Sequence, residues 1–186
     1  MATSFLDLGE IIQLLDIKPG QLIADFGAGS GFWALTAARQ TGPSGIVYAL
    51  DIQEQPLEII RKKARELRLA NLRPEKANLE KLGGSGLNNN SCDWVFLINV
   101  LFQNERSENL LAEARRILKP RGRVLVIDRE PEKIVGIKKR PLSSRQIKEI
   151  FRRLGLTSQK EFSASQNHFG LIFSRPTGLK KLFSLY

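Results

Sequence analysis

Three glycines at alternate positions, Gly27, Gly29 and Gly31, have the spacing of a ligand-binding turn. They follow the apolar run 21–26 and precede a stretch with helical periodicity, 30–40, so the pattern predicts a strand, a tight turn and a helix. Glycine has no side chain, which permits the turn and lets a ligand approach the backbone closely. The free backbone amides at the start of the helix would then face that ligand. Many strand-to-helix loops also contain glycine, so a second feature is needed.

Asp51 is that second feature, because it ends the next apolar run, 46–50. A carboxylate at a strand end can accept hydrogen bonds from both hydroxyls of a ribose. Nucleotide-binding folds place it roughly 20 residues after the glycine turn, as here. Asp51 could equally cap the helix that we expect to begin near Gln55. Together with the glycine turn, Asp51 predicts an adenosine-type ligand.

Strand-like and helix-like patterns alternate along the rest of the chain. The expected strands are residues 21–26, 46–50, 72–77, 94–100, 124–127, 158–162 and 168–174. The near-continuous hydrophobicity of 94–100 (WVFLINV) indicates a central parallel strand that is covered on both faces. The last two strands are too close in sequence for a helical crossover and should pair antiparallel. The prediction is an α/β three-layer sandwich with a Rossmann-like, mostly parallel seven-stranded sheet and an antiparallel C-terminal edge hairpin.

Amphipathic spacing predicts the helices that cover this sheet. They are expected at residues 5–15, 30–40, 57–67, 110–118 and 147–154. The first should present Phe5, Leu8, Ile12 and Leu15 on one face. Pro120 and Gly122 should end the fourth. The segment 83–91 (GGSGLNNNS) has the composition of an exposed flexible loop.

The overall composition bounds the class of protein. With 42% hydrophobic and 26% charged residues, the chain should fold as a globular domain. We expect one domain, 1–175, followed by a tail, 176–186, and we expect it in the cytoplasm because no secretion signal or membrane-length apolar run is present. Cys92 is the single cysteine, so no zinc cluster or other metal site is expected. The oligomeric state stays open.

The charge is strongly positive, with 29 Lys and Arg against 19 Asp and Glu, a net +10. Such a field attracts anionic partners, which include nucleic acid, anionic lipid and phosphorylated small molecules, although solvated lysines and arginines on an ordinary surface are an equal alternative. A basic rim is expected in the loop after the fifth strand, on the ligand side of the sheet: Lys133, Lys138, Lys139 and Arg140. The other basic group is expected to be a solvated helix face: Arg61, Lys62, Lys63, Arg65 and Arg68.

Several of these segments resemble a known family. Residues 25–31 (DFGAGSG) resemble the D-x-G-x-G-x-G first motif of class I S-adenosylmethionine (SAM) dependent methyltransferases. Residues 99–102 followed by 110–123 (LLAEARRILKPRGR) are similar to the ubiquinone/menaquinone-biosynthesis-like (type 11 domain) methyltransferases, in which a helix ends in Leu-Lys-Pro-Gly-Gly. Arg121 stands at the first glycine of that ending. Residues 168–173 are similar to the last strand of the same family, and the resemblance covers residues 15–175.

The resemblance implies SAM as the cofactor and assigns its contacts by position. Four residues would lie against the methionine end of SAM: Asp25, Gly27, Ala28 and Gly29. The others would be Asp51 and Ile52 at the ribose and adenine, Asn78 and Leu79 at the adenine, and Asn99 beside the methionine or methyl group. The family usually has Asp where Asn78 stands, and the Asn carbonyl can still accept from the adenine amino group.

Methyl transfer from a sulfonium is an in-line displacement, in which the protein aligns the reactants and, for some nucleophiles, removes a proton. Asp128, at the end of the fifth strand, is the candidate base, and it could instead cap a turn or pair with Arg129. Glu130 is a second, less favoured candidate. His168, the single histidine, should lie on the edge hairpin in a structural role.

Three functions are therefore compatible with the sequence. The favoured one is a SAM-dependent methyltransferase with a small-molecule or lipid-like anionic acceptor. The second is a methyltransferase acting on RNA or a ribosome-associated substrate through the basic surface, although no Asn/Asp-Pro-Pro-Tyr/Phe sequence follows the fourth strand. The third is a SAM- or nucleotide-binding module without turnover.

Overall fold

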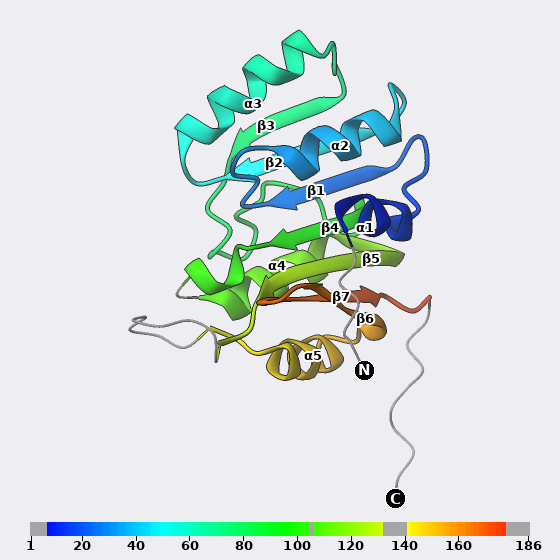
Figure 1. The fold of residues 1–186 in the computed structure, drawn as a ribbon, viewed down its shortest axis with the longest axis vertical. Coiled ribbons are helices and arrows are strands. Elements are labelled where there is room, and N and C mark those ends of the chain that lie inside the picture. Colours follow the sequence, from blue (N-terminus) through cyan, green and yellow to red (C-terminus); the bar gives the residue numbers. More distant parts are fainter. Residues whose placement is uncertain (1–6, 105, 132–140, 178–186) are drawn as a thin grey trace, which may run out of the picture.

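The computed structural model describes residues 7–104, 106–131 and 141–177, which form a sheet with helices on both faces (Figure 1). The seven strands lie in the order β3-β2-β1-β4-β5-β7-β6. Neighbours from β3 to β5 pair parallel, whereas β7 pairs antiparallel with both β5 and β6. The predicted α/β class and the antiparallel C-terminal hairpin are confirmed.

Most elements lie where the sequence patterns predict them, although β5 is much longer than the predicted strand 124–127. The strands are β1 (Leu22–Phe26), β2 (Ile46–Asp51), β3 (Leu72–Lys76), β4 (Cys92–Ile98), β5 (Leu118–Arg129), β6 (Thr157–Ser165) and β7 (His168–Ser174). The helices are α1 (Leu8–Leu15), α2 (Phe32–Thr41), α3 (Glu54–Glu66), the short 3-10 helix η1 (Leu101–Gln103), α4 (Ser107–Ile117) and α5 (Ser144–Arg153).

The sheet separates two hydrophobic clusters, which accounts for the apolar character of its central strands. Helices α1, α2 and α3 pack into one cluster with Ile23 and Phe96. Helices α4 and α5 pack into the other with Phe26 and Leu97. Alternate side chains of β1 and β4 thus enter opposite layers, as a parallel strand covered on both faces requires.

The face that helix α1 buries agrees with the predicted one in part. Leu15 is buried as predicted and Ile12 is half-buried, but Ile11 is buried in addition and Leu8 is 52% exposed. Phe5, also on the predicted face, lies outside the described residues. The helix begins at a capping box in which Asp7 and Glu10 each accept the other's backbone amide.

The boundary between α4 and β5 also differs from the prediction. Helix α4 ends at Ile117, and Leu118 already has extended backbone angles and pairs with Cys92 of β4. Pro120 and Gly122 therefore lie inside the strand rather than at a helix end. An irregularity in the β4–β5 register between Cys92 and Trp94 accommodates this early start.

The strand order creates a switch point between β1 and β4. The chain leaves β1 toward β2 on one side, while β4 and β5 continue the sheet on the other side. In open parallel sheets, ligands bind outside the carboxyl ends of the strands at such a point. The glycine turn, Asp51, Asn99 and Asp128 all stand at this edge because each ends or follows one of these strands.

Two predicted features lie outside the described residues. They are the basic rim of Lys133, Lys138, Lys139 and Arg140, and residues 178–186 of the tail. Within the described parts of the chain, no helix is long and apolar enough to cross a membrane.

Candidate functional site

The glycine turn after β1 is folded back against the end of β2. The amides of Gly27 and Ala28 both donate to the carbonyl of Leu50, at 2.7 and 3.0 Å. Gly27 has a φ of +70°, and a Cβ atom there would lie 2.6 Å from Cγ2 of Val100. Gly31 has a φ of +80°, and its Cβ would lie 2.5 Å from Cγ1 of Ile60. These two glycines are required by close packing on Val100, which follows β4, and on Ile60 of α3.

Gly29 differs from its two neighbours. A Cβ on Gly29 would meet no described atom closer than the Gly27 carbonyl oxygen at 3.8 Å. The space beside its backbone is therefore open at the switch point, where a ligand can approach closely. Gly29 is the glycine of the turn whose role fits ligand access rather than internal packing.

Several amides of the turn itself are already hydrogen-bonded, whereas the amides at the start of α2, those of Phe32 and Trp33, receive no side-chain cap. Gly29 donates to Asp51 and Gly31 donates to the carbonyl of Ala28, in addition to the two bonds to Leu50. This edge also offers a ligand several acceptors, namely carboxylates, carbonyls and an amide oxygen.

Asp51 joins the ends of β1 and β2. Its Oδ2 accepts the Gly29 amide at 3.1 Å, and its Oδ1 accepts the Gln53 amide at 3.0 Å. The second bond organises the turn that leads into α3, which begins at Glu54. Each carboxylate oxygen can accept a further hydrogen bond. Asp51 can therefore shape the turn and still bind the two hydroxyls of a ribose.

Asp25 is buried at the end of β1, with 2% of its surface exposed. Burial raises the pKa of its carboxyl from 3.8 to about 7, opposed by the Ala34 amide and reinforced by the negative charge of Asp51. Burial thus shifts this carboxyl toward its protonated form. A cationic ligand at this edge would stabilise its charged form.

Asn99 follows β4 in a left-handed conformation, with a φ of +52°. Its amide donates to the carbonyl of Ile127 at 2.8 Å, and its carbonyl accepts from the Gln103 side chain at 2.6 Å. Its side-chain Oδ1 is buried and has no hydrogen-bond partner among the described residues. An unpaired buried acceptor costs free energy unless a donor reaches it, so this atom indicates a missing hydrogen-bond donor.

The residues predicted at the adenine differ in how they are placed. Ile52 is 56% exposed, so its side chain is available to an apolar ring. Asn78 uses its Oδ1 to accept the Glu80 amide at 3.2 Å. Leu79 is buried in the core with α4, so only its backbone is left to contact a ligand.

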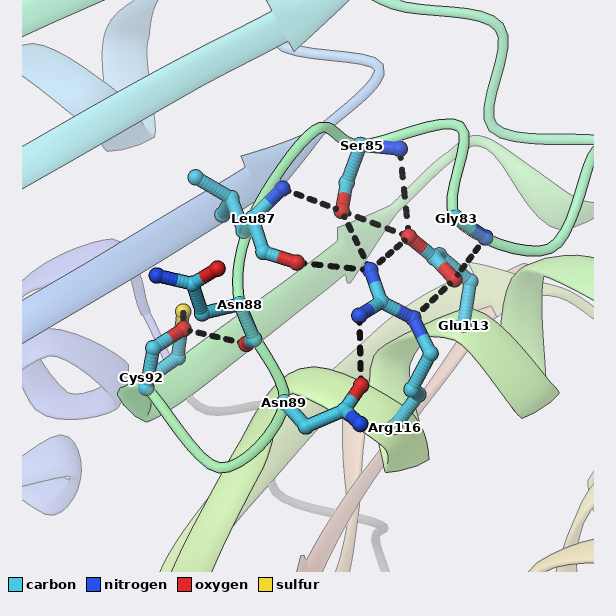
Figure 2. Close-up of polar contacts among 9 residues, drawn as sticks. Gly83, Ser85, Leu87, Asn88, Asn89, Cys92, Glu113 and Arg116 are labelled. Atoms are coloured by element: carbon cyan, nitrogen blue, oxygen red, sulfur yellow. Dashed lines mark hydrogen bonds and ion pairs between the residues drawn. The ribbon is translucent and has the colours of Figure 1, made fainter.

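A buried ion pair on α4 organises the loop that follows these residues (Figure 2). The carboxylate of Glu113 accepts from the amides of Gly83 and Ser85, at 2.7 and 3.1 Å, and from the Ser85 hydroxyl at 2.5 Å. It also accepts hydrogen bonds from Nε and Nη2 of Arg116, at 2.8 and 2.7 Å. Arg116 in turn donates to the Leu87 carbonyl and to Asn89. The prediction of an exposed flexible loop at 83–91 is wrong at this point, because Ser85 is 4% exposed and its backbone is fixed.

This cluster is connected to the predicted adenine side of the site. Gly84 lies so close to Asn78 that a Cβ on it would come within 1.9 Å of the Asn78 carbonyl oxygen. Asn109 of α4 also donates to the Glu80 carbonyl at 2.7 Å. Helix α4 therefore fixes the segment from Asn78 to Ser85. This role of Glu113 was not predicted from the sequence, although a charged residue among the inward-facing positions 110, 114 and 117 was a signal for it.

Asp128 is engaged by three backbone amides. Its Oδ2 accepts the amides of Leu101 and Phe102, at 2.9 and 3.4 Å, and its Oδ1 accepts the Arg129 amide at 2.8 Å. Burial raises its pKa to about 6, and the three amides oppose that rise. Asp128 thereby anchors η1 beside Asn99, which corresponds to the capping alternative.

The two other side chains considered for acid–base or nucleophilic chemistry are those of His168 and Cys92. His168 shares a hydrogen bond with the Ser165 hydroxyl at 2.7 Å, and burial together with Arg129 lowers its pKa. Cys92 is buried at the start of β4, on the edge opposite the glycine turn, and burial raises the pKa of its thiol to about 12. A protonated thiol at that edge is not a nucleophile for this site.

Comparison with known proteins gives a consistent family. A family model described as a methyltransferase domain matches residues 17–168. A demethylmenaquinone methyltransferase of Bacillus cereus is 25% identical over 178 residues, which are 95% of this chain and 72% of that protein. One of Bacillus mycoides is 26% identical over 155 residues, which are 83% of this chain and 64% of that protein.

Solved structures show the same fold. A SAM-dependent methyltransferase from Aquifex aeolicus superposes with a TM-score of 0.75 at 24% identity, covering 89% of this chain and 88% of that one. The cyclase SpnF superposes equally well, with a TM-score of 0.75 at 16% identity, covering 91% of this chain and 82% of that one. Because a methyltransferase and a cyclase share this architecture, the likeness in shape establishes the fold and not the reaction.

Proposed function

This chain belongs to the methyltransferase domain family, and from that membership we propose that it transfers the methyl group of SAM to an anionic small-molecule or lipid-like acceptor. The family match covers the glycine turn, Asp51, Asn78 and Asn99, which are the residues assigned to the cofactor. The proposal therefore concerns the same edge of the sheet that the fold makes available to a ligand.

The unpaired Oδ1 of Asn99 is the observation that carries the proposal. SAM presents hydrogen-bond donors in its ammonium group, its ribose hydroxyls and its adenine amino group. This edge presents acceptors that match them: Asn99 Oδ1, the Asp51 carboxylate and the Asn78 side-chain oxygen. The ammonium group is the donor that suits Asn99, and it would favour the charged form of the nearby buried Asp25. The acceptors that the protein presents at this edge thus fit the donors of SAM in both polarity and charge.

The residues of the chain bind and align the cofactor in this scheme. When bound, SAM supplies a methyl group on a sulfonium, which needs no further activation. Asp51 binds the ribose while it holds Gly29, and Ile52 provides an apolar surface for the adenine. Asp128 fixes η1, and with it the backbone that follows Asn99. Reaction rate would then depend mainly on alignment, since Asp128 is occupied by three amides.

The nature of the acceptor rests on two further considerations. The relatives from Bacillus cereus and Bacillus mycoides are named for demethylmenaquinone, which supports a lipid-like acceptor. The net charge of +10 supports an anionic one. Methylation of RNA or a ribosome-associated substrate stays a prediction that rests on the charge alone.

Native mass spectrometry of the purified protein, followed by calorimetry with S-adenosylhomocysteine, tests the cofactor. We expect a co-purifying mass of SAM or S-adenosylhomocysteine and a single binding site that Asp51→Ala abolishes. A wild-type protein that binds neither compound would contradict the proposal. Radiolabelled methyl transfer to a membrane-lipid extract, compared with transfer to total RNA, then tests the acceptor class. Cofactor binding without transfer to either would instead favour a binding module without turnover.

A further inference from the structure

A second hollow lies at the opposite edge of the sheet from the glycine turn. It has a volume of about 280 Å³ and is formed where β1, β4 and β5 begin. Charged side chains line most of it: Asp16, Lys18, Asp93, Arg121 and Arg123. Gln21, Trp94, Pro120 and Gly122 complete the lining. This hollow shares no lining residue with the proposed cofactor site.

The charges in the hollow do not cancel. Lys18 pairs with Asp16 at 2.5 Å, and Lys119 pairs with Asp93 at 2.8 Å. Asp93 also accepts the Leu22 amide at 2.8 Å, which fixes it in place. Among the described residues, no carboxylate lies within ion-pair distance of Arg121 or Arg123. The hollow therefore keeps two uncompensated guanidinium groups.

Arg121 occupies a backbone position that favours glycine. Its φ is +66°, in the left-handed region where a side chain is strained. The conformation is enforced from both sides, because the Arg121 amide donates to the Arg175 carbonyl at 2.8 Å and the Arg175 amide donates to the Gly122 carbonyl at 2.9 Å. Glycine stands at this position in the Leu-Lys-Pro-Gly-Gly pattern that the segment resembles. Arg121 therefore holds a backbone conformation that glycine would adopt without strain.

Arg123 is oriented by an aromatic ring. Its guanidinium carbon lies 5.6 Å from the centre of the Trp94 ring, which is almost wholly buried beneath it. A cation over an aromatic face is attracted to it, and the planar group loses freedom before any ligand arrives. Arg123 therefore presents its donors in a largely fixed position.

We propose that this hollow is a binding site for a phosphate-type oxyanion, held between Arg121 and Arg123. A guanidinium group offers two parallel N–H donors that match two phosphate oxygens. Two such groups and the nearby lysines suit a phosphate or diphosphate better than a single carboxylate. The neutralised carboxylates of Asp16 and Asp93 border the site and limit its size.

Calorimetric titration with inorganic diphosphate at low salt tests the proposal. We expect one site per chain, with affinity weakened about tenfold or more by Arg121→Gly and by Arg123→Gln. Arg121→Gly restores the residue that suits this backbone, so it should fold at least as stably as the wild type. Tryptophan fluorescence in a Trp33→Phe background, where Trp94 is the single tryptophan, should change on addition of diphosphate.

Arg68→Gly provides a matched control, because Arg68 is also an arginine with positive φ, at +55°, and does not line the hollow. It should leave diphosphate binding unchanged. Equal weakening by Arg68→Gly and Arg121→Gly, or no binding to the wild type, would overturn the proposal. Competition with a short single-stranded RNA distinguishes the source of the phosphate. If the RNA displaces diphosphate, the ligand of the hollow is a phosphodiester chain. If it does not, the ligand is a free phosphate compound. Both results depend on diphosphate binding in the hollow.

Discussion

The carboxylate of Asp51 accepts the backbone N–H of Gly29 at 3.1 Å, so the end of β2 and the turn after β1 are one structural unit. The same carboxylate fixes the entry to α3 through the Gln53 amide. A residue proposed to bind ribose therefore also shapes the glycine turn. Substitutions at Asp51 must separate these two roles.

Asp51→Asn and Asp51→Ala separate them. The Asn side chain keeps an oxygen that can accept the Gly29 amide but loses the charge and half of the acceptors, so we expect roughly tenfold weaker binding of S-adenosylhomocysteine. Ala removes both roles, and we expect roughly a hundredfold loss or more. Calorimetry measures both values, and Asp16→Asn, at the opposite edge, serves as the control. Equal affinity of all three variants and the wild type would exclude Asp51 from the site.

Asn99 is tested by a pair of substitutions that differ only in backbone strain. Both Asn99→Gly and Asn99→Ala remove the unpaired Oδ1, and each should weaken cofactor binding by roughly 10-fold to 100-fold. The alanine variant should be about 1 kcal/mol less stable than the glycine variant, because a Cβ is strained at a φ of +52° and glycine has none. Chemical denaturation and calorimetry give the two readings. Asn90→Gly, at a φ of +56° and far from the cofactor edge, should leave cofactor affinity unaltered.

The pKa of Asp25 predicts an unusual dependence of stability on pH. The folded-state pKa of about 7 lies above the ordinary 3.8, so between these values the native protein holds a proton that the unfolded chain has lost. Stability should therefore fall as pH rises from about 4 to 7, by at most about 1.4 kcal/mol per pH unit from this group. Urea denaturation of the wild type and Asp25→Asn across this range measures it. Asp128, with a pKa of about 6, contributes a slope of the same sign to both proteins, so their difference isolates Asp25.

Cofactor binding should shift the carboxyl of Asp25 back toward its ionised form. A bound ammonium or sulfonium group favours the ionised form of Asp25, so binding should release protons near pH 6. Calorimetry in two buffers of different ionisation enthalpy counts these protons. Asp25→Asn should release fewer, and a wild type that takes up protons instead would contradict the assignment.

The sheet and the glycine turn were predictable because they depend on local patterns. Apolar runs located the strands, and the alternation of strands and helices fixed the class of fold. The purpose of Gly27 was not predictable, because it depends on contact with Val100 of a distant segment. Only the three-dimensional arrangement shows that Leu50 and Asp51 accept from the amides of the turn.

Composition was a poor guide where a distant charged residue controls a loop. The segment 83–91 is rich in glycine and asparagine, which favours exposure, yet Glu113 fixes it through backbone amides. Backbone angles are equally invisible in a sequence without turn glycines. The positive φ of Asn99 and of Arg121 became evident only in the structure.

Glu113 and Arg116 provide the last prediction, because their buried ion pair fixes the loop beside Asn78. Burial raises the pKa of Glu113, but bonds from Arg116, Ser85 and Gly83 outweigh it and lower the pKa from 4.5 to about 2. Its contribution to stability is thus present above about pH 4.5 and is lost as pH falls toward 2. Glu113→Gln leaves Arg116 without its partner and should cost about 3 to 5 kcal/mol.

Loss of the ion pair should also reach the cofactor, since the segment from Asn78 to Ser85 loses its anchor on α4. We expect Glu113→Gln to raise the KM for SAM several-fold with a smaller change in kcat, whereas a purely structural role would lower the active fraction and leave KM unchanged.

The double variant Glu113→Leu, Arg116→Met removes both charges and should recover much of the stability. It should not recover the KM, because Leu cannot accept from the Gly83 and Ser85 amides. Recovery of both would show that the charges matter only for folding. Glu149→Gln, which breaks exposed ion pairs on α5, should change neither quantity.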